Sequence, residues 1–246
     1  ITPCPGKIVA WRPLGADARL RPSQSSPDSK MPRYPRLVVP GIPHHVTQRG
    51  VQKRKTFFRP LDYLTYLELL REYKNKAGVV IWAYCLMPNH IHMVVVPESE
   101  ASLAKCFGPL HAQYAAKVNV SHGWQGHLWQ QRFYSVAMDE RHTLAAIRYV
   151  ELNPVRAGLC KFPHEWRWSS ANAHLTGAHD VLLEKSAADD LVSDWREYLL
   201  APGSAEAQDA LRRHTRTGRP VGNEDFIEQL EALTGRSIQV RKPGPQ

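Results

Sequence analysis

The sequence predicts an α+β fold, in which an antiparallel sheet carries helices packed on one face. Two β-rich apolar runs, 79–87 and 90–96, are joined by only two residues, Pro and Asn, as expected for an antiparallel hairpin. Stretches with helical spacing precede and follow this hairpin, at 61–77 and 102–119. With a strand before the first helix, the order strand, helix, strand, strand, helix is that of an α+β sandwich.

The N-terminal part divides into two segments. Residues 1–30 are rich in Pro and Ser and show no periodicity, so we expect a disordered extension. Residues 31–60 contain seven basic residues and no acidic one. Within them, 45–48 (HVTQ) predicts a short strand, and Arg49-Gly50 predicts its exit into a basic loop.

The helices are predicted from spacing and from their ends. In 61–77, leucines fall on or near one stripe and Gly78 ends the helix; these leucines are Leu61, Leu64, Leu67 and Leu70. A third helix should run from about Glu140 to Leu152. We expect it to end near Asn153, because Pro154 disfavours the α conformation in the residue before it. The Trp- and Gly-containing stretch 122–138 is expected to hold a further short strand pair.

These elements suggest one domain over 31–177 and a small, partly basic helical appendage over 178–246, with a helical pattern around Phe226, Leu230 and Leu233. The four cysteines form no CxxC pair, which indicates reduced thiols in a cytosol. No apolar run approaches the roughly 20 residues that span a bilayer. The net charge of +9 suits a polyanionic partner.

Two histidines in the second strand of the hairpin are candidate metal ligands. Side chains at i and i+2 of a strand point to the same face, about 6.6 Å apart, so His90 and His92 could hold one metal ion while Ile91 and Met93 pack into the core. The alternative is that both histidines are simply polar residues on a solvated face.

Tyr149 and Asn153 are four residues apart and share a helix face. A tyrosine hydroxyl has a pKa of about 10 and is a poor nucleophile, but it can attack a phosphate that a divalent cation polarises. The alternative is an ordinary core aromatic. Tyr114 competes for the role, but its nearby Asn119 lies five residues on, off the shared face, and we prefer Tyr149.

Five sequence blocks together resemble the REP-associated tyrosine transposases of the HUH superfamily, which are similar to Y1 single-strand transposases. The resemblance runs from about Met31 to Gly177, and the tail TRTGRPVGNEDFIEQLE also looks like the family's C-terminal region. The blocks are GIPHHVTQRG, YCLMPNHIHMVVVP, LWQQRFYS, RYVELNPVRAGL and WRWSSANAHLTG. The resemblance implies a ferredoxin-like, RRM-like core that cleaves single-stranded DNA near palindromic REP hairpins in the bacterial cytoplasm, in association with the nucleoid.

The resemblance also assigns roles to individual residues. His90 and His92 would be the metal-binding histidines, and Asn153 would be the polar third ligand of Mg²⁺ or Mn²⁺. Tyr149 would be the nucleophile that forms a 5′-phosphotyrosine intermediate. The chain is expected to act as a monomer rather than as a homodimer.

Substrate binding is expected to come from cations that neutralise phosphates and from one aromatic side chain that stacks on bases. The cations of the N-terminal region are Arg49, Lys53, Arg54, Lys55 and Arg59. Arg132 and Tyr134 are further candidates, and the tail cations Arg212, Arg213, Arg216 and Arg219 could hold a hairpin stem.

Three other functions remain open from the sequence. A rolling-circle replication initiator or a plasmid relaxase would use related chemistry, although such proteins usually continue into a further large domain. A catalytically idle DNA- or RNA-hairpin binder could use the same sheet. A binding module with a purely structural metal site is the third possibility, for which a closed set of four ligands would be expected.

Overall fold

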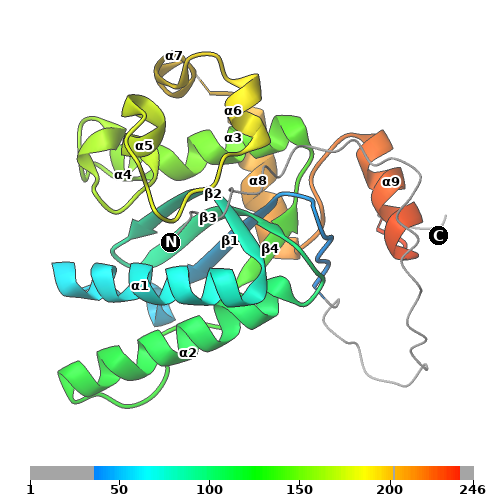
Figure 1. Ribbon diagram of the computed structural model, residues 1–246. Helices are drawn as coiled ribbons and strands as arrows, with labels where there is room; N and C mark the ends of the chain where they lie inside the picture. Colours follow the sequence, from blue (N-terminus) through cyan, green and yellow to red (C-terminus); the bar gives the residue numbers. More distant parts are fainter. Residues whose placement is uncertain (1–35, 202, 239–246) are drawn as a thin grey trace, which may run out of the picture.

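The computed structural model describes residues 36–201 and 203–238, and the predicted extension 1–30 lies outside them. In this part of the chain the centre is a four-stranded antiparallel sheet in the order β2-β3-β1-β4. The strands are β1 (His44–Arg49), β2 (Val79–Met87), β3 (His90–Pro97) and β4 (Tyr134–Ala137). β1 and β3 are therefore the two central strands (Figure 1).

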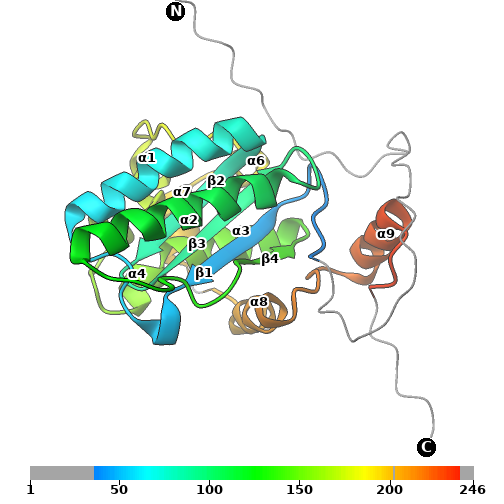
Figure 2. The same ribbon diagram turned by 90° about the horizontal axis from the view of Figure 1, so that it is seen from below.

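Helices α1 (Pro60–Ala77) and α2 (Ser102–His122) cover one face of this sheet (Figure 2). Their aromatic side chains, among them Tyr66 and Phe107, pack on Ile91 and Met93 of β3 in a buried core. The chain order β1-α1-β2-β3-α2-β4, combined with this strand order, is that of a ferredoxin-like fold. The predicted α+β class and the predicted hairpin are thus confirmed.

The opposite face of the sheet is covered as well. Helix α3 (Glu140–Glu151) buries Ala146 and Ile147 against Val94 and its neighbours, and helix α8 (Ala205–Thr217) adds Leu211 to the same core. The expectation of helices on one face applies to α1 and α2, and the structure adds α3 and α8 on the other face (Figure 1). The C-terminal region therefore contributes to the sheet's second core.

The remaining helices are short, except α9, and lie around this framework. Helix α9 packs Phe226 and Leu230 against Leu37, Val39 and Ala137, beside the start of β1. The helices are η1 (Val51–Lys53), α4 (Asn153–Arg156), η2 (Pro163–Glu165), α5 (Ala171–Thr176), α6 (Ala187–Leu191), α7 (Trp195–Leu200) and α9 (Glu224–Thr234).

Only part of the leucine stripe predicted for α1 is buried. Leu61 and Leu64 are 62% and 43% exposed, whereas Tyr66 and Leu70 are fully buried. Each step of three residues falls about 60° short of a full helical turn, so leucines at successive three-residue steps drift around the helix. The core contacts therefore come mainly from Tyr63, Tyr66 and Leu70.

Two further expectations change in detail. The stretch 122–138 contributes one strand, β4, which pairs with β1, and not a strand pair. Helical backbone also continues past Asn153, because Leu152 keeps an α conformation and Pro154 falls in the first turn of α4. A proline is tolerated there, since its missing N–H has no partner within the helix.

No helix in the described ranges combines the length and the apolar character needed to cross a membrane.

We expect Gly78→Ala to destabilise the fold by about 1–3 kcal/mol. Gly78 ends α1 with a φ of +63°, and an added Cβ would lie 2.5 Å from a carboxylate oxygen of Glu98. Gly108→Ala is the matched control, because Gly108 lies inside α2 with open space around it; this change should be neutral or stabilising. Urea unfolding measures both, and equal effects of the two substitutions would contradict the assignment.

Candidate functional site

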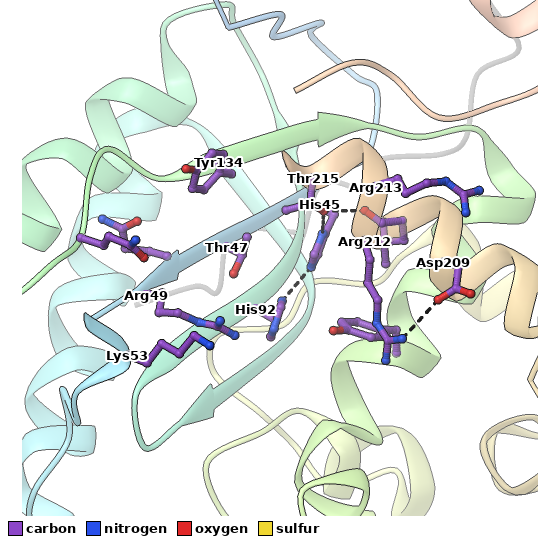
Figure 3. A pocket seen from close by; sticks show the side chains of 14 residues that line it. His45, Thr47, Arg49, Lys53, His92, Tyr134, Asp209, Arg212, Arg213 and Thr215 are labelled. Atoms are coloured by element: carbon purple, nitrogen blue, oxygen red, sulfur yellow. Dashed lines mark hydrogen bonds and ion pairs between the residues drawn. The ribbon is translucent and has the colours of Figure 1, made fainter. Parts of the chain in front are cut away.

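A cavity of about 720 Å³ lies on the second face of the sheet, between β1, β3, α3 and α8 (Figure 3). Its walls are mainly polar and basic side chains. They are His45, Thr47, Gln48, Arg49, Lys53, His92, Gln130, Tyr134, Tyr149, Asp209, Leu211, Arg212, Arg213 and Thr215. The cavity thus brings together residues 45–53 and residues 209–215, which are far apart in the sequence.

The pairing of β1 with β3 places the two predicted histidines. Thr47 lies opposite His92, and Arg49 lies opposite His90. The His90 and His92 rings are 4.9 Å apart between centroids and nearly perpendicular. Ile91, between them, points into the core beneath α1 and α2. The two histidines therefore lie side by side on the face that carries α3, as the alternation of a strand predicts.

Each histidine has its Nδ1 atom engaged in a hydrogen bond. His90 Nδ1 lies 2.5 Å from Asn89 Oδ1, and the Asn89 amide nitrogen donates to the Lys53 carbonyl at 2.9 Å. His92 Nδ1 lies 2.9 Å from Nε2 of His45, whose ring is nearly coplanar with that of His92. Nε2 is thus the nitrogen that each of His90 and His92 has left for a ligand.

Burial keeps these imidazoles neutral at pH 7. Desolvation, assisted by the charge of Arg49, lowers the pKa of His90 to about 4. Burial also lowers the pKa of His45 to about 4 and that of His92 well below its usual value. A neutral imidazole keeps a lone pair, which is what coordination of a cation requires.

Tyr149 faces the histidines from α3. Its ring is perpendicular to that of His92, with 5.4 Å between centroids. The guanidinium groups of Arg156 and Arg212 lie 4.5 and 5.6 Å from the centre of the Tyr149 ring. A hydrogen bond with Tyr149 is the main cause that raises the pKa of Arg212. The phenol is therefore held between a neutral imidazole and two cations.

The two other residues weighed from the sequence have different surroundings. The side-chain nitrogen of Asn153 is buried and has no hydrogen-bond partner among the described residues, and Asn153 is not among the residues that line the cavity. Tyr114 lies on α2 and is fully buried, and its hydroxyl donates to the Thr56 carbonyl at 2.7 Å. Tyr114 is therefore on the side of the sheet opposite to His92.

Five of the residues expected to bind DNA line the cavity: Arg49, Lys53, Tyr134, Arg212 and Arg213. The others lie elsewhere. Arg54 and Lys55 are exposed on the basic loop, and Arg59 forms an ion pair with Asp62 at 3.8 Å. Arg132 borders a second cleft beside α2, and Arg219 follows the end of α8. The side chain of Arg216 lies outside the described part of the structure.

Sequence reasoning did not identify His45, Thr215 or Arg156. His45 could have been found, because it alternates with Thr47 and Arg49 on β1 and so shares their face. No local pattern points to Thr215, which is 170 residues away from its partner His45. Such a contact follows only from the packing of α8 against the sheet.

A buried carboxylate holds α3 in place beside Tyr149. Glu151 is fully buried and accepts hydrogen bonds from Ser170 Oγ at 2.5 Å and His174 Nδ1 at 2.6 Å. Burial alone would lower the pKa of His174, but the Glu151 carboxylate, assisted by nearby aspartates, raises it above its usual value. The helix that carries Tyr149 is thus anchored to the segment around α5.

Comparisons with known proteins identify similar transposases. Residues 39–153 match the family model of IS200-like transposases. A candidate REP-associated tyrosine transposase from Haemophilus influenzae is 25% identical over 99 residues, which cover 36% of this chain and 56% of that protein. The alignment thus spans little more than half the length of that relative. The resemblance expected from the sequence blocks is confirmed at the level of the family.

Two solved structures are also similar. A structure of a REP-associated tyrosine transposase bound to a REP hairpin is 20% identical, with a TM-score of 0.49, over 65% of this chain and 94% of that chain. A candidate transposase from Deinococcus radiodurans is 15% identical, with a TM-score of 0.35, over 50% of this chain and 96% of that chain.

We expect Glu151→Ala to reduce the free energy of unfolding by about 3 kcal/mol, because it leaves the buried Ser170 and His174 side chains without their acceptor. Glu140→Ala removes an exposed carboxylate from the same helix and should cost less than about 1 kcal/mol. Urea unfolding of the two variants tests this. A smaller loss for Glu151→Ala than for Glu140→Ala would refute the anchoring role.

The pair should also make stability depend on pH. Because the folded-state pKa of His174 is raised, its contribution is complete below the unfolded value of about 6.5 and is lost as pH rises through the folded pKa. Unfolding curves from pH 6 to pH 9 should therefore show a fall in stability that is smaller in His174→Gln. Identical pH profiles would contradict the assignment.

Proposed function

We propose that this chain, whose residues 39–153 match the family model of IS200-like transposases, nicks and joins single-stranded DNA with Tyr149 as nucleophile. One observation carries the proposal: Tyr149 meets His92 edge to face inside a cavity lined by cations. The competing Tyr114 has its hydroxyl engaged in the core on the opposite side of the sheet. A polarised phosphate in the cavity would therefore be within the reach of Tyr149 and not of Tyr114.

The chemistry of His90, His92 and Asn153 fits a divalent cation, although only His92 lines the cavity. His90 and His92 would bind it through Nε2, since both rings are neutral and have Nδ1 engaged elsewhere. The described residues contain no cluster of three His, Cys, Asp or Glu side chains suited to a metal. We therefore propose the side-chain oxygen of Asn153, whose amide nitrogen has no hydrogen-bond partner among the described residues, as the third ligand. Such a set leaves positions open for phosphate and water, and we propose Mg²⁺ or Mn²⁺.

In the proposed reaction, the Tyr149 oxygen attacks the scissile phosphorus and loses its proton. The bond from phosphorus to the 3′ oxygen breaks, and that oxygen gains a proton to become a 3′-hydroxyl. The product is a 5′-phosphotyrosine, which conserves the phosphodiester and lets a 3′-hydroxyl rejoin the strands in the reverse step. The bound cation would supply charge neutralisation at the phosphate.

Arg212 and Arg156 would assist at the phenol oxygen. Both guanidinium groups lie against the Tyr149 ring; Arg156 also donates to the main-chain carbonyl of Tyr149, and Arg212 is paired with Asp209 at 3.2 Å. When a strand is rejoined, the tyrosine oxygen leaves with negative charge, which a fixed cation stabilises. The same cations would neutralise the transferred phosphate while it is attached to Tyr149.

The substrate follows from the cavity and from the family. Arg49, Lys53 and Arg213 can neutralise backbone phosphates, and Tyr134, which is 41% exposed, can stack on a base. A similar protein has been solved in complex with a REP hairpin. We propose DNA hairpins of this kind as the substrate, and the bacterial cytoplasm, at the nucleoid, as the place of action. Tyr149 lies beside His92 of its own chain, with 5.4 Å between the ring centroids, and we propose action as a monomer.

The test is covalent capture of DNA. Wild-type protein incubated with Mn²⁺ and a 5′- and 3′-labelled library of single-stranded hairpins should form a protein–DNA adduct that carries the 3′ side of the cleaved strand. Tyr149→Phe keeps the ring that packs on His92 and should form none.

Tyr73→Phe is the matched control, because it removes a tyrosine hydroxyl on α1, outside the cavity, and should leave adduct formation intact. An adduct that survives in Tyr149→Phe would assign the nucleophile elsewhere. Hairpin binding by the wild type without any adduct would identify a binding protein that does not cleave.

A further inference from the structure

A line of hydrogen bonds connects α8 with His92 across the second face of the sheet (Figure 3). Thr215 Oγ1 lies 2.7 Å from the carbonyl of Leu211 in the same helix. The same oxygen lies 3.2 Å from Nδ1 of His45, on β1. Nε2 of His45 lies 2.9 Å from Nδ1 of His92, on β3. Three elements that are distant in sequence are thus joined by consecutive polar contacts.

The direction of each bond follows from the number of hydrogens available. A carbonyl only accepts, so the single hydroxyl hydrogen of Thr215 points to Leu211. Towards His45, the Thr215 oxygen can therefore only accept, and His45 Nδ1 carries the proton. A neutral imidazole has one N–H, so His45 Nε2 accepts and Nδ1 of His92 is the donor.

We infer that His45 and Thr215 are positioning residues, which hold His92 in the tautomer protonated at Nδ1 so that its Nε2 lone pair is available to a divalent cation. The metal part of this inference rests on the proposed function. The tautomer itself does not, since it follows from the contacts of the protein alone. Neither ring nitrogen of His45 is free for a metal, because Nδ1 faces Thr215 and Nε2 faces His92.

The arrangement restricts the orientation of the His92 ring as well as its proton. The two imidazoles lie edge to edge in nearly the same plane, with 5.1 Å between centroids and 7° between planes, as a hydrogen bond between their ring nitrogens requires. His45 is only 1% exposed and lies on a central strand, so it offers a rigid support. Outer hydrogen bonds of this kind typically change metal affinity by about 10–100-fold when removed.

The two metal-binding histidines would thus be oriented by different means. His90 is held by its sequence neighbour Asn89, whose amide is oriented in turn by the Lys53 carbonyl. His92 depends on a residue of another strand and on a helix near the C-terminal end of the described chain. Changes at Thr215 should therefore affect His92 and leave His90 unaltered.

The first experiment determines the tautomers in the metal-free, full-length protein, from long-range proton–nitrogen correlations of ¹⁵N-labelled histidines. We expect both His90 and His92 to be protonated at Nδ1. In His45→Leu, which cannot accept a hydrogen bond, His92 should shift towards protonation at Nε2. In His45→Gln, the amide oxygen can replace the acceptor and should restore the original tautomer. His90 is the internal reference and should not change.

The second experiment measures Mn²⁺ affinity, from the electron paramagnetic resonance signal of the free ion, with no DNA present. We expect His45→Leu to bind Mn²⁺ about 10–100-fold more weakly than the wild type. Thr215→Val, which keeps the size of the side chain, should weaken binding in the same direction by a smaller factor. His45→Gln should lie close to the wild type. Circular dichroism establishes that each variant is folded.

Several outcomes would overturn the inference. Protonation of wild-type His92 at Nε2 would do so, and so would an unchanged tautomer in folded His45→Leu. Loss of Mn²⁺ binding in His45→Gln as complete as in His92→Ala, with Thr215→Val unaffected, would make His45 a direct ligand instead. Absence of Mn²⁺ binding by the wild type would count against the proposed metal site, whereas the tautomer measurement would still decide the role of His45.

Discussion

The pairing of β1 with β3 at the centre of the sheet is the constraint on which the site depends. This pairing sets Thr47 opposite His92 and Arg49 opposite His90, and it directs Ile91 and Met93 into the opposite core. Because side chains alternate between faces, a shift of one residue along β3 would bury both imidazoles among the aromatic residues of α1 and α2. The apolar residues between the histidines therefore determine which face the histidines occupy.

A second constraint comes from polar groups that lie within the folded core. His45, His92 and Glu151 are all buried, and each is hydrogen-bonded to another side chain. An unpaired polar group at such depth is costly, so these contacts have to form together with the fold. The same contacts orient the side chains around Tyr149. Stability and the geometry of the cavity thus depend on the same few hydrogen bonds.

The sequence predicted much of the fold, because the hairpin and the helices depend on local spacing and on residues that end elements, such as Gly78. It was less informative about which side chains of a helix face the core, as the exposed Leu61 of α1 illustrates. Within the site, the motif pointed to His90, His92 and Tyr149, which lie on one side of the sheet. Asn153 and the other proposed roles stay predictions.

Long-range packing explains what sequence reasoning did not find. Arg212 was expected to hold a hairpin stem, yet α8 brings it against the ring of Tyr149. The contact of Thr215 with His45 joins residues from opposite ends of the described chain. Neither contact has a local pattern, since both arise from the way in which one helix crosses the second face of the sheet.

The place of α8 also bears on how the site can change between relatives. The stretch that matches the family ends at residue 153, whereas Leu211, Arg212 and Thr215 come from beyond it. A fragment confined to that stretch would retain the histidine motif and Tyr149 but would lack one wall of the cavity. A change of sequence in α8 would therefore alter the chemistry of the site, although every residue of its motif stays the same.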